Sequence, residues 1–214
     1  LKSVKISKDI TSIGDNAFSY CSGLTSVEIP DSVTSIGGSA FNGCSSLNSI
    51  VLPEGVTSIG YAAFKDCSSL TSINIPEGVQ EIRQSTFSAC SSLEEVTIPA
   101  TVTNIQSWAF DNCTKLQRVY CKPTTPPTLY QGMFDEAHAS LKIYVPANSL
   151  DSYKKKQYWS AYASKMDIYY TPTECTALTI EADDTEGRMT TTTVRYTAVT
   201  NGMTFNDVAV SGVT

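Results

Sequence analysis

Apolar residues recur along the first half of the chain with a period of 23 residues. Phenylalanine, cysteine and leucine each occupy one column of this repeat, and polar residues fill the places between them. A fixed period of 20 to 29 residues is typical of solenoids built from stacked coils. The columns that predict this array are Phe18, Phe41, Phe64, Phe87 and Phe110; Cys21, Cys44, Cys67, Cys90 and Cys113; and Leu1, Leu24, Leu47, Leu70, Leu93 and Leu116.

Within one repeat the spacing of the apolar residues predicts the local structure. Val27 and Ile29 lie two positions apart, so both side chains point inward from one strand. Pro30 ends that strand because it has no N–H to donate to a neighbour. A second extended piece is expected over 33–36, and 40–44 suit one helical or 3₁₀ turn.

The repeats predict a leucine-rich solenoid over 1–170, a right-handed stack of about six to seven coils in a mainly β, α-β architecture. The sixth coil departs from the pattern at the proline-rich stretch 122–127. Residues 146–170 leave the repeat, and Tyr153, Trp159 and Tyr162 are spaced as on one face of a helix. We therefore expect an amphipathic helix that caps the open end of the core.

The composition changes after the solenoid. Residues 171–214 alternate apolar and polar positions and are rich in β-branched residues, which predicts a small all-β segment that is part of an immunoglobulin-like domain. This length is short for a self-sufficient β-sandwich, so we expect either that such a domain is cut partway or that the segment docks on the solenoid. Because Leu1 already lies inside a repeat, we expect the chain to be a piece of a longer protein.

Charge and hydropathy exclude two classes of partner for this segment. The net charge is −6 and no basic stripe is visible, so nucleic acid is not an expected partner. No run of 18 apolar residues occurs, so no membrane span is expected. We expect a monomer.

The seven cysteines leave three interpretations open. Stacked equivalent residues lie about 5 Å apart, which permits a disulfide by Cα distance, but the side chains point the same way. A zinc site would need closely spaced ligand pairs, which a spacing of 23 does not supply. The favoured interpretation is that each column cysteine is a small buried apolar residue.

Candidate catalytic groups are sparse. The single histidine, His138, has no accompanying nucleophile motif, and the adjacent acids Asp183 and Asp184 suit a hairpin turn. No phosphate-binding loop is present. We therefore expect neither an enzyme nor a cofactor or metal site.

The outward positions of the strands are the remaining candidates for function. Their first half is smooth and weakly polar, and their second half gains charge and tyrosine. Tyrosine and arginine dominate the energetics of many interfaces, and solenoids bind partners along such faces. The candidate partner-binding residues are Glu95, Arg118, Tyr120, Lys142 and Tyr144.

The unit "LTSVEIPDSVTSIGGSAFNGCSS", residues 24–46, resembles the 23-residue repeat of BspA-type leucine-rich repeat proteins of commensal bacteria. The resemblance covers about residues 1–170. It implies a secreted or surface-anchored protein, often a lipoprotein, that adheres to host or bacterial surface proteins or to glycans. Arg83 and Gln106 depart from the family pattern, because they replace the glycine that follows the second isoleucine.

Taken together, these observations predict a non-enzymatic adhesion module at the cell surface that recognises protein or glycan through the solenoid. Two alternatives stay open: a structural spacer that presents another domain, and an accessory protein for polysaccharide handling.

Overall fold

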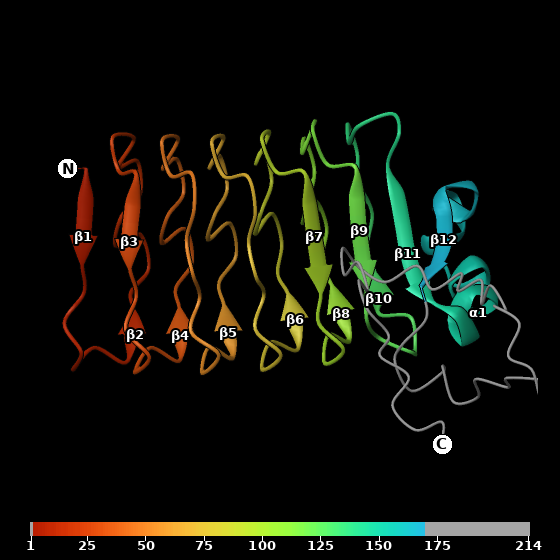
Figure 1. Cartoon of the computed structure of the whole chain (residues 1–214), viewed down its shortest axis with the longest axis horizontal. Coiled ribbons are helices and arrows are strands. Elements are labelled where there is room, and N and C mark those ends of the chain that lie inside the picture. The colour runs from red at the N-terminus through yellow and green to blue at the C-terminus, as the bar shows by residue number, and fades with distance from the viewer. Residues whose placement is uncertain (1, 170–214) are drawn as a thin grey trace, which may run out of the picture. The chain divides into compact units, whose positions relative to one another are not determined.

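The computed structural model describes residues 2–169, which fold as a solenoid of about seven turns. Equivalent segments of successive coils lie side by side along the stack, from β1 to α1 (Figure 1). The solenoid predicted from the repeat is therefore confirmed. The expected all-β segment at 171–214 lies outside the described residues.

One row of strands is formed by the segments of each repeat that are equivalent to residues 27–29. It comprises β1 (Ser3–Lys5), β3 (Ser26–Glu28), β7 (Glu95–Ile98), β9 (Arg118–Cys121) and β11 (Lys142–Pro146), and β12 (Met166–Tyr169), from beyond the repeats, extends the row beside β11. β1 pairs with β3 in parallel, and β7, β9 and β11 pair in parallel with one another. We call the outward side of this row the strand face.

The two coils between β3 and β7 contribute only one bridge to the strand face, Asn74 to Thr97. Strands form where the outward side chains also pair across coils, as Lys5 does with Glu28 and Glu95 with Arg118. The two intervening coils have Val51 and Asn74 at the position of Lys5 and Glu28, and these side chains form no ion pair. Cross-strand side-chain pairs stabilise a sheet, so their absence there accounts for the looser pairing.

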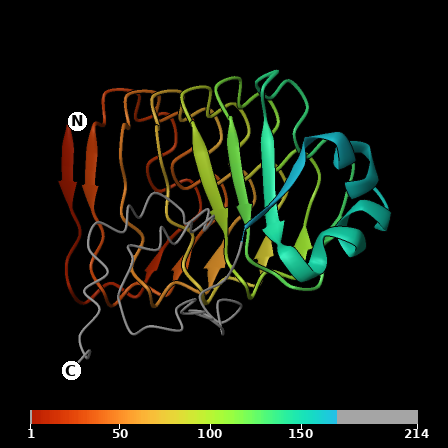
Figure 2. The same ribbon diagram turned by 45° about the vertical axis from the view of Figure 1, so that its right-hand side comes forward.

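A second row of two-residue strands follows the predicted extended pieces (Figure 2). Its inward isoleucines and leucine are buried, and the strands pair in parallel as two separate sheets of three strands each. The strands are β2 (Ser12–Ile13), β4 (Ser35–Ile36), β5 (Ser58–Ile59), β6 (Glu81–Ile82), β8 (Asn104–Ile105) and β10 (Thr128–Leu129).

The third side of each coil, which we call the turn face, consists of consecutive tight turns rather than the expected helical turn. The residues two positions before and two positions after each phenylalanine adopt a positive φ, as at Ser39 and Gly43. This geometry lets the backbone bond sideways instead of along a helix: Phe41 N–H donates to the Ala63 carbonyl of the next coil at 2.8 Å. The turn face is thus a third hydrogen-bonded layer.

The phenylalanine column runs through the core. Phe41, Phe64, Phe87 and Phe110 are fully buried, and successive ring centroids lie 5.2 to 5.6 Å apart. Neighbouring rings are within 5° to 13° of parallel. The rings therefore stack at the spacing of the coils, and each one packs against both neighbours.

The cysteine column lies beside these rings and consists of free thiols. Each buried thiol donates to the phenylalanine carbonyl of the preceding coil, as Cys67 Sγ does to Phe41 O at 3.2 Å and Cys90 Sγ to Phe64 O at 3.2 Å. The sulfurs therefore link coils as weak hydrogen-bond donors in addition to filling space. Burial raises the pKa of Cys44 to about 11 and that of Cys113 to about 12.

Three short helices follow β11, where the sequence predicts one amphipathic helix. They are η1 (Ala147–Ser149), α1 (Leu150–Lys155) and η2 (Trp159–Lys165). α1 ends because the backbone becomes extended at Lys156, and Tyr158 then takes a φ of 65°. The predicted single helix is therefore wrong, although the aromatic residues that suggested it do face the core.

The aromatic residues of these helices bond to the proline-rich stretch of the sixth coil. Tyr153 Oη donates to the Pro123 carbonyl and Trp159 Nε1 to the Pro127 carbonyl, both at 2.8 Å, and both side chains are fully buried. The rings of Tyr153 and Trp159 meet edge to face at 4.9 Å. These bonds satisfy the carbonyl groups of two buried prolines, Pro123 and Pro127.

Truncation of a central ring should be costly. We expect Phe64→Ala to lower the free energy of unfolding by about 3–5 kcal/mol, because it removes a fully buried ring and both of its stacking contacts. Phe18→Ala is the matched control, since Phe18 is half-buried and stacks on one described neighbour only. Urea unfolding measures both variants, and equal losses would contradict the stacking account.

The thiols should react in the order of their burial. In a Cys175→Ser background at pH 8, we expect iodoacetamide to label half-buried Cys21 first, while Cys67 and Cys90 stay unlabelled until the protein unfolds. Mass spectrometry identifies the labelled positions. Labelling of Cys67 in the native protein would show that the column is open.

The same thiols should make stability fall in alkali. The unfolded chain releases thiol protons near the ordinary pKa of 9.0, whereas folded Cys44 keeps its proton to about pH 11. The free energy of unfolding should therefore decline as pH rises above 9. A Cys44→Ala variant should show a shallower decline in urea titrations, and an unchanged slope would contradict the assignment.

Candidate functional site

The five candidate residues predicted from the sequence lie together on the strand face. β7, β9 and β11 are in register, which places Glu95 opposite Arg118 and Arg118 opposite Lys142. Two positions along, Tyr120 lies opposite Tyr144. We call these five residues the strand-face patch.

The first row of the patch is held by an ion pair. Arg118 Nε donates to Glu95 Oε2 at 3.0 Å, with both side chains about half exposed. This bond raises the pKa of Arg118 above its usual value. An exposed pair of this kind adds little stability, so its main effect is to hold the guanidinium in a defined position.

The second row is an aromatic pair. The rings of Tyr120 and Tyr144 stack with centroids 5.0 Å apart and planes 17° from parallel. Partial burial, followed by the nearby Glu95 and Tyr144, raises the pKa of Tyr120, so its hydroxyl stays neutral and able to donate at physiological pH. The pair presents a rigid amphipathic surface to solvent.

The charge of the patch is opposite in sign to that of the chain. Lys142 is exposed, and within residues 2–169 it lies beyond ion-pair distance of any carboxylate. Within the five residues two cations thus accompany the carboxylate of Glu95, while the whole chain carries −6; Glu94, outside the patch, also lies near Arg118. The arrangement suits a partner that presents carboxylates beside apolar surface.

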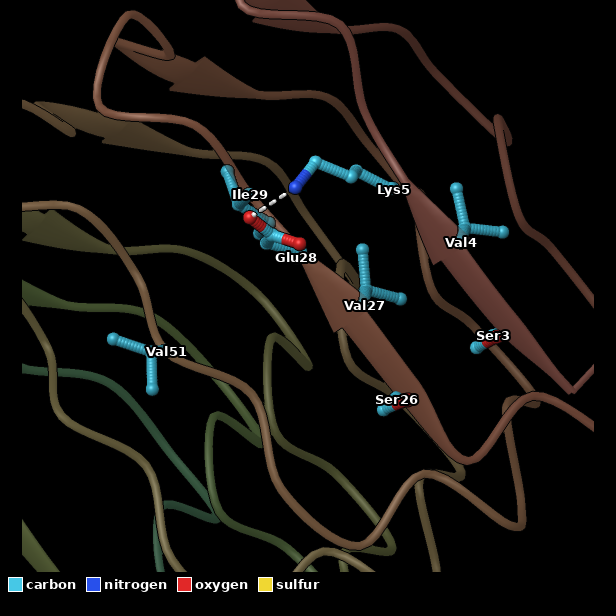
Figure 3. Close-up of a pocket in the computed structure, with 8 residues that line it drawn as sticks. All are labelled: Ser3, Val4, Lys5, Ser26, Val27, Glu28, Ile29 and Val51. Atoms are coloured by element: carbon cyan, nitrogen blue, oxygen red, sulfur yellow. Dashed lines mark ion pairs between the residues drawn. The ribbon is translucent and has the colours of Figure 1, made fainter.

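A hollow lies at the N-terminal end of the same strand face, between β1 and the third coil (Figure 3). Lys5 and Glu28 lie across from each other there, with Nζ and Oε1 3.0 Å apart. Val51 on the next coil is 77% exposed. The two charges pair with each other, so this hollow offers mainly apolar surface.

On the second strand row, a polar cluster surrounds Glu81, which sequence reasoning did not single out. Oε1 accepts from Asn104 Nδ2 at 2.6 Å and from Gln106 Nε2 at 2.8 Å, and Arg83 Nε lies 3.4 Å from Oε2. Arg83 and Gln106, the departures from the repeat pattern, therefore satisfy Glu81. The cluster is a structural network between coils.

The remaining chemical candidates stay isolated. His138 Nδ1 contacts Ser140 Oγ at 2.7 Å and accepts from the Ser140 N–H at 3.2 Å, which is a local contact within an exposed loop. In the part of the chain that the structure describes, no group of three or more His, Cys, Asp or Glu residues is placed to hold a metal ion. No helix within residues 2–169 is both long and apolar enough to cross a membrane. Asp183 and Asp184 lie outside the described residues.

Comparison with known proteins identifies the repeat. The model of the BspA-type leucine-rich repeat region matches residues 1–117 in six copies. A search among curated proteins found no match.

Solved bacterial structures share the fold. A leucine-rich repeat protein of T. pallidum is 35% identical over 67% of this chain and 68% of its own, with a TM-score of 0.62. A protein of Bacteroides ovatus is 24% identical over 79% of this chain and 55% of its own, with a TM-score of 0.52. A protein of Eubacterium ventriosum is 22% identical over 66% of this chain and 44% of its own, with a TM-score of 0.56.

The chain thus spans about two thirds of the T. pallidum protein and about half of the other two. The family model covers more than half of the chain, and the structural relatives are leucine-rich repeat proteins of bacteria. The repeat, the stacked coils and these matches agree: the chain belongs to the BspA-type leucine-rich repeat family.

Proposed function

We propose that the chain is a non-enzymatic binding module that captures a protein ligand through the strand-face patch. The observation that carries the proposal is the convergence of Arg118 and Lys142 with the stacked pair Tyr120 and Tyr144 on three adjacent strands. Arginine and tyrosine are the residue types that most often dominate interface energetics. The BspA-type repeat family is not generally enzymatic, which agrees with a binding role.

The expected ligand is a protein segment with carboxylates beside apolar side chains. The two cations attract the carboxylates, and the tyrosine pair buries apolar atoms while its hydroxyls bond at the rim. Since the pair is already stacked, little side-chain entropy is lost on binding. A host or bacterial surface protein of this chemistry would suit the patch.

The proposed location is the bacterial cell surface, where a solenoid of this family would meet such partners. Family membership supports this placement. Export and anchoring by a lipid group, and an immunoglobulin-like character of 171–214, are part of the same proposal.

The helical segment 147–165 is proposed to cap the solenoid. Without Tyr153 and Trp159, the core edge of the last coil and the carbonyls of Pro123 and Pro127 would face water. Solenoids need such a terminal element because each coil buries its apolar edge against the next one.

Substitutions in the patch test the binding role. We expect Arg118→Ala and Tyr120→Ala each to weaken capture at least about tenfold, because each removes a central anchor. The measurement is surface plasmon resonance against a panel of purified extracellular-matrix and bacterial surface proteins. Lys5→Ala is the matched control, since it breaks a comparable ion pair at the other end of the same face.

If the wild type binds a panel member and both variants bind it equally well, the binding site lies elsewhere. If the wild type binds no panel member while a neighbouring domain of the parent protein does, the spacer alternative is favoured. Measurable turnover of polysaccharide would instead support the accessory role in polysaccharide handling.

Tyr153→Phe tests the cap. Loss of the hydroxyl leaves the buried Pro123 carbonyl without that donor, so we expect the free energy of unfolding to fall by about 1–3 kcal/mol. Tyr158→Phe, at an exposed position of the same segment, should change it by less than about 0.5 kcal/mol. Equal small effects in urea unfolding would argue against a cap.

A further inference from the structure

The turn face carries exposed aromatic residues that the strand-face proposal leaves unused. Tyr20, Tyr61 and Trp108 are 74%, 57% and 45% exposed. Each lies against a glycine of an adjoining coil: a Cβ added to Gly43 or Gly38 would come within 2.7 Å of Tyr20 or 2.5 Å of Tyr61. Aromatic rings thus occupy the space that a side chain at the adjoining glycine would fill.

A hollow of about 410 Å³ opens on the turn face beside Trp108. Its floor is the fourth coil, where Ser88 and Ala89 stand at positions that carry larger side chains in both the third and the fifth coil, and Ser85 stands at the position of Trp108. The third and fifth coils are separated by two strand spacings, about 10 Å. That width accommodates one six-membered ring above the small residues of the floor.

Trp108 forms one wall of the hollow and is held in place. Its backbone takes a φ of 59°, unusual for a bulky residue, and the equivalent residue of the next coil is Gly132 at 76°. A Cβ on Gly132 would lie 2.6 Å from Trp108 Cδ1, so the glycine is required for the indole to fit. The ring is thus bounded by Gly132 on one side of the stack and by the hollow on the other.

Polar groups line the other edges. Asn112 Nδ2 donates to Asp111 Oδ2 at 2.8 Å on the fifth coil. On the third coil, Lys65 Nζ lies 3.8 Å from Asp66 Oδ2, with both side chains nearly half exposed. Two carboxylates, an amide and an ammonium therefore surround one aromatic wall, with a net charge of −1.

A pyranose ring matches this combination of groups. Its C–H face packs on an indole, and its hydroxyls donate to carboxylates and accept from amide and ammonium groups. The two carboxylates disfavour sulfated or sialylated sugars by like-charge repulsion. A purely apolar peptide side chain would make no use of the acceptor positions that Asp66 and Asp111 have left beside Lys65 and Asn112.

We propose that the hollow beside Trp108 binds a neutral hexose unit of a glycan, with Trp108 stacking on the ring and Asp66 and Asp111 accepting its hydroxyls. This site lies on the turn face, whereas the strand-face patch occupies a different side of the coils. The inference does not depend on the proposed protein ligand.

The test uses neutral hexasaccharides of glucose, galactose and mannose, with sialylated and sulfated oligosaccharides beside them, in isothermal titration calorimetry with the full chain. We expect at least one neutral hexasaccharide to bind, and Trp108→Ala to weaken that binding at least about tenfold. Tyr61→Ala is the matched control, because it removes an exposed aromatic residue of the same face outside the hollow.

A second variant fills the hollow without changing the backbone. Ala89 has a φ of 59°, and Tyr20 occupies the equivalent position of the first coil at 57°, so Ala89→Tyr is compatible with this geometry. It should abolish binding while thermal unfolding shows a folded protein.

Several outcomes would overturn the proposal: binding of no neutral sugar, sugar binding that survives both Trp108→Ala and Ala89→Tyr, or binding of anionic sugars alone. Arg118→Ala should leave sugar binding unchanged, and Trp108→Ala should leave protein capture unchanged. The two experiments therefore distinguish an error in the sugar-site proposal from an error in the protein-binding proposal.

Discussion

Bonding between each coil and its nearest neighbour is the constraint on which the rest of the structure depends. The amide of each turn-face phenylalanine donates to the next coil, as Phe18 N does to Ala40 O at 2.7 Å and Phe64 N to Thr86 O at 2.9 Å. The rings then stack at the same spacing as the backbone. Each coil therefore covers its apolar edge through its neighbours, and the ring column continues to Phe134 at 5.9 Å although the sixth coil is one residue longer.

This constraint applies to the inward columns and leaves the outward ones free. Ser26, Glu95 and Arg118 are equivalent positions of the strand face, yet only the last two form an ion pair. On the turn face, Ala89 and Asn112 are likewise equivalent. One repeated backbone therefore supports different chemistry at different coils, and function in such a protein is set by which coil departs from the others.

The two faces carry contrasting chemistry. The strand-face patch is cationic and presents stacked tyrosines, whereas the hollow beside Trp108 is acidic and has a single indole wall. A protein segment and a neutral sugar would suit them respectively. Since they lie on different sides of the coils, occupation of one leaves the other accessible.

The sequence alone determined the period, the two strand segments, the inward columns and the co-location of Glu95, Arg118, Tyr120, Lys142 and Tyr144, since a fixed period places equivalent residues side by side. It did not reveal the thiol bonds to phenylalanine carbonyls, the break in the helix at Tyr158, or the hollow beside Trp108. The period fixes which residues are neighbours but not their backbone angles. The left-handed residues of the turn face, and the hollow that small side chains leave between larger ones, were decided only when the coils packed against one another.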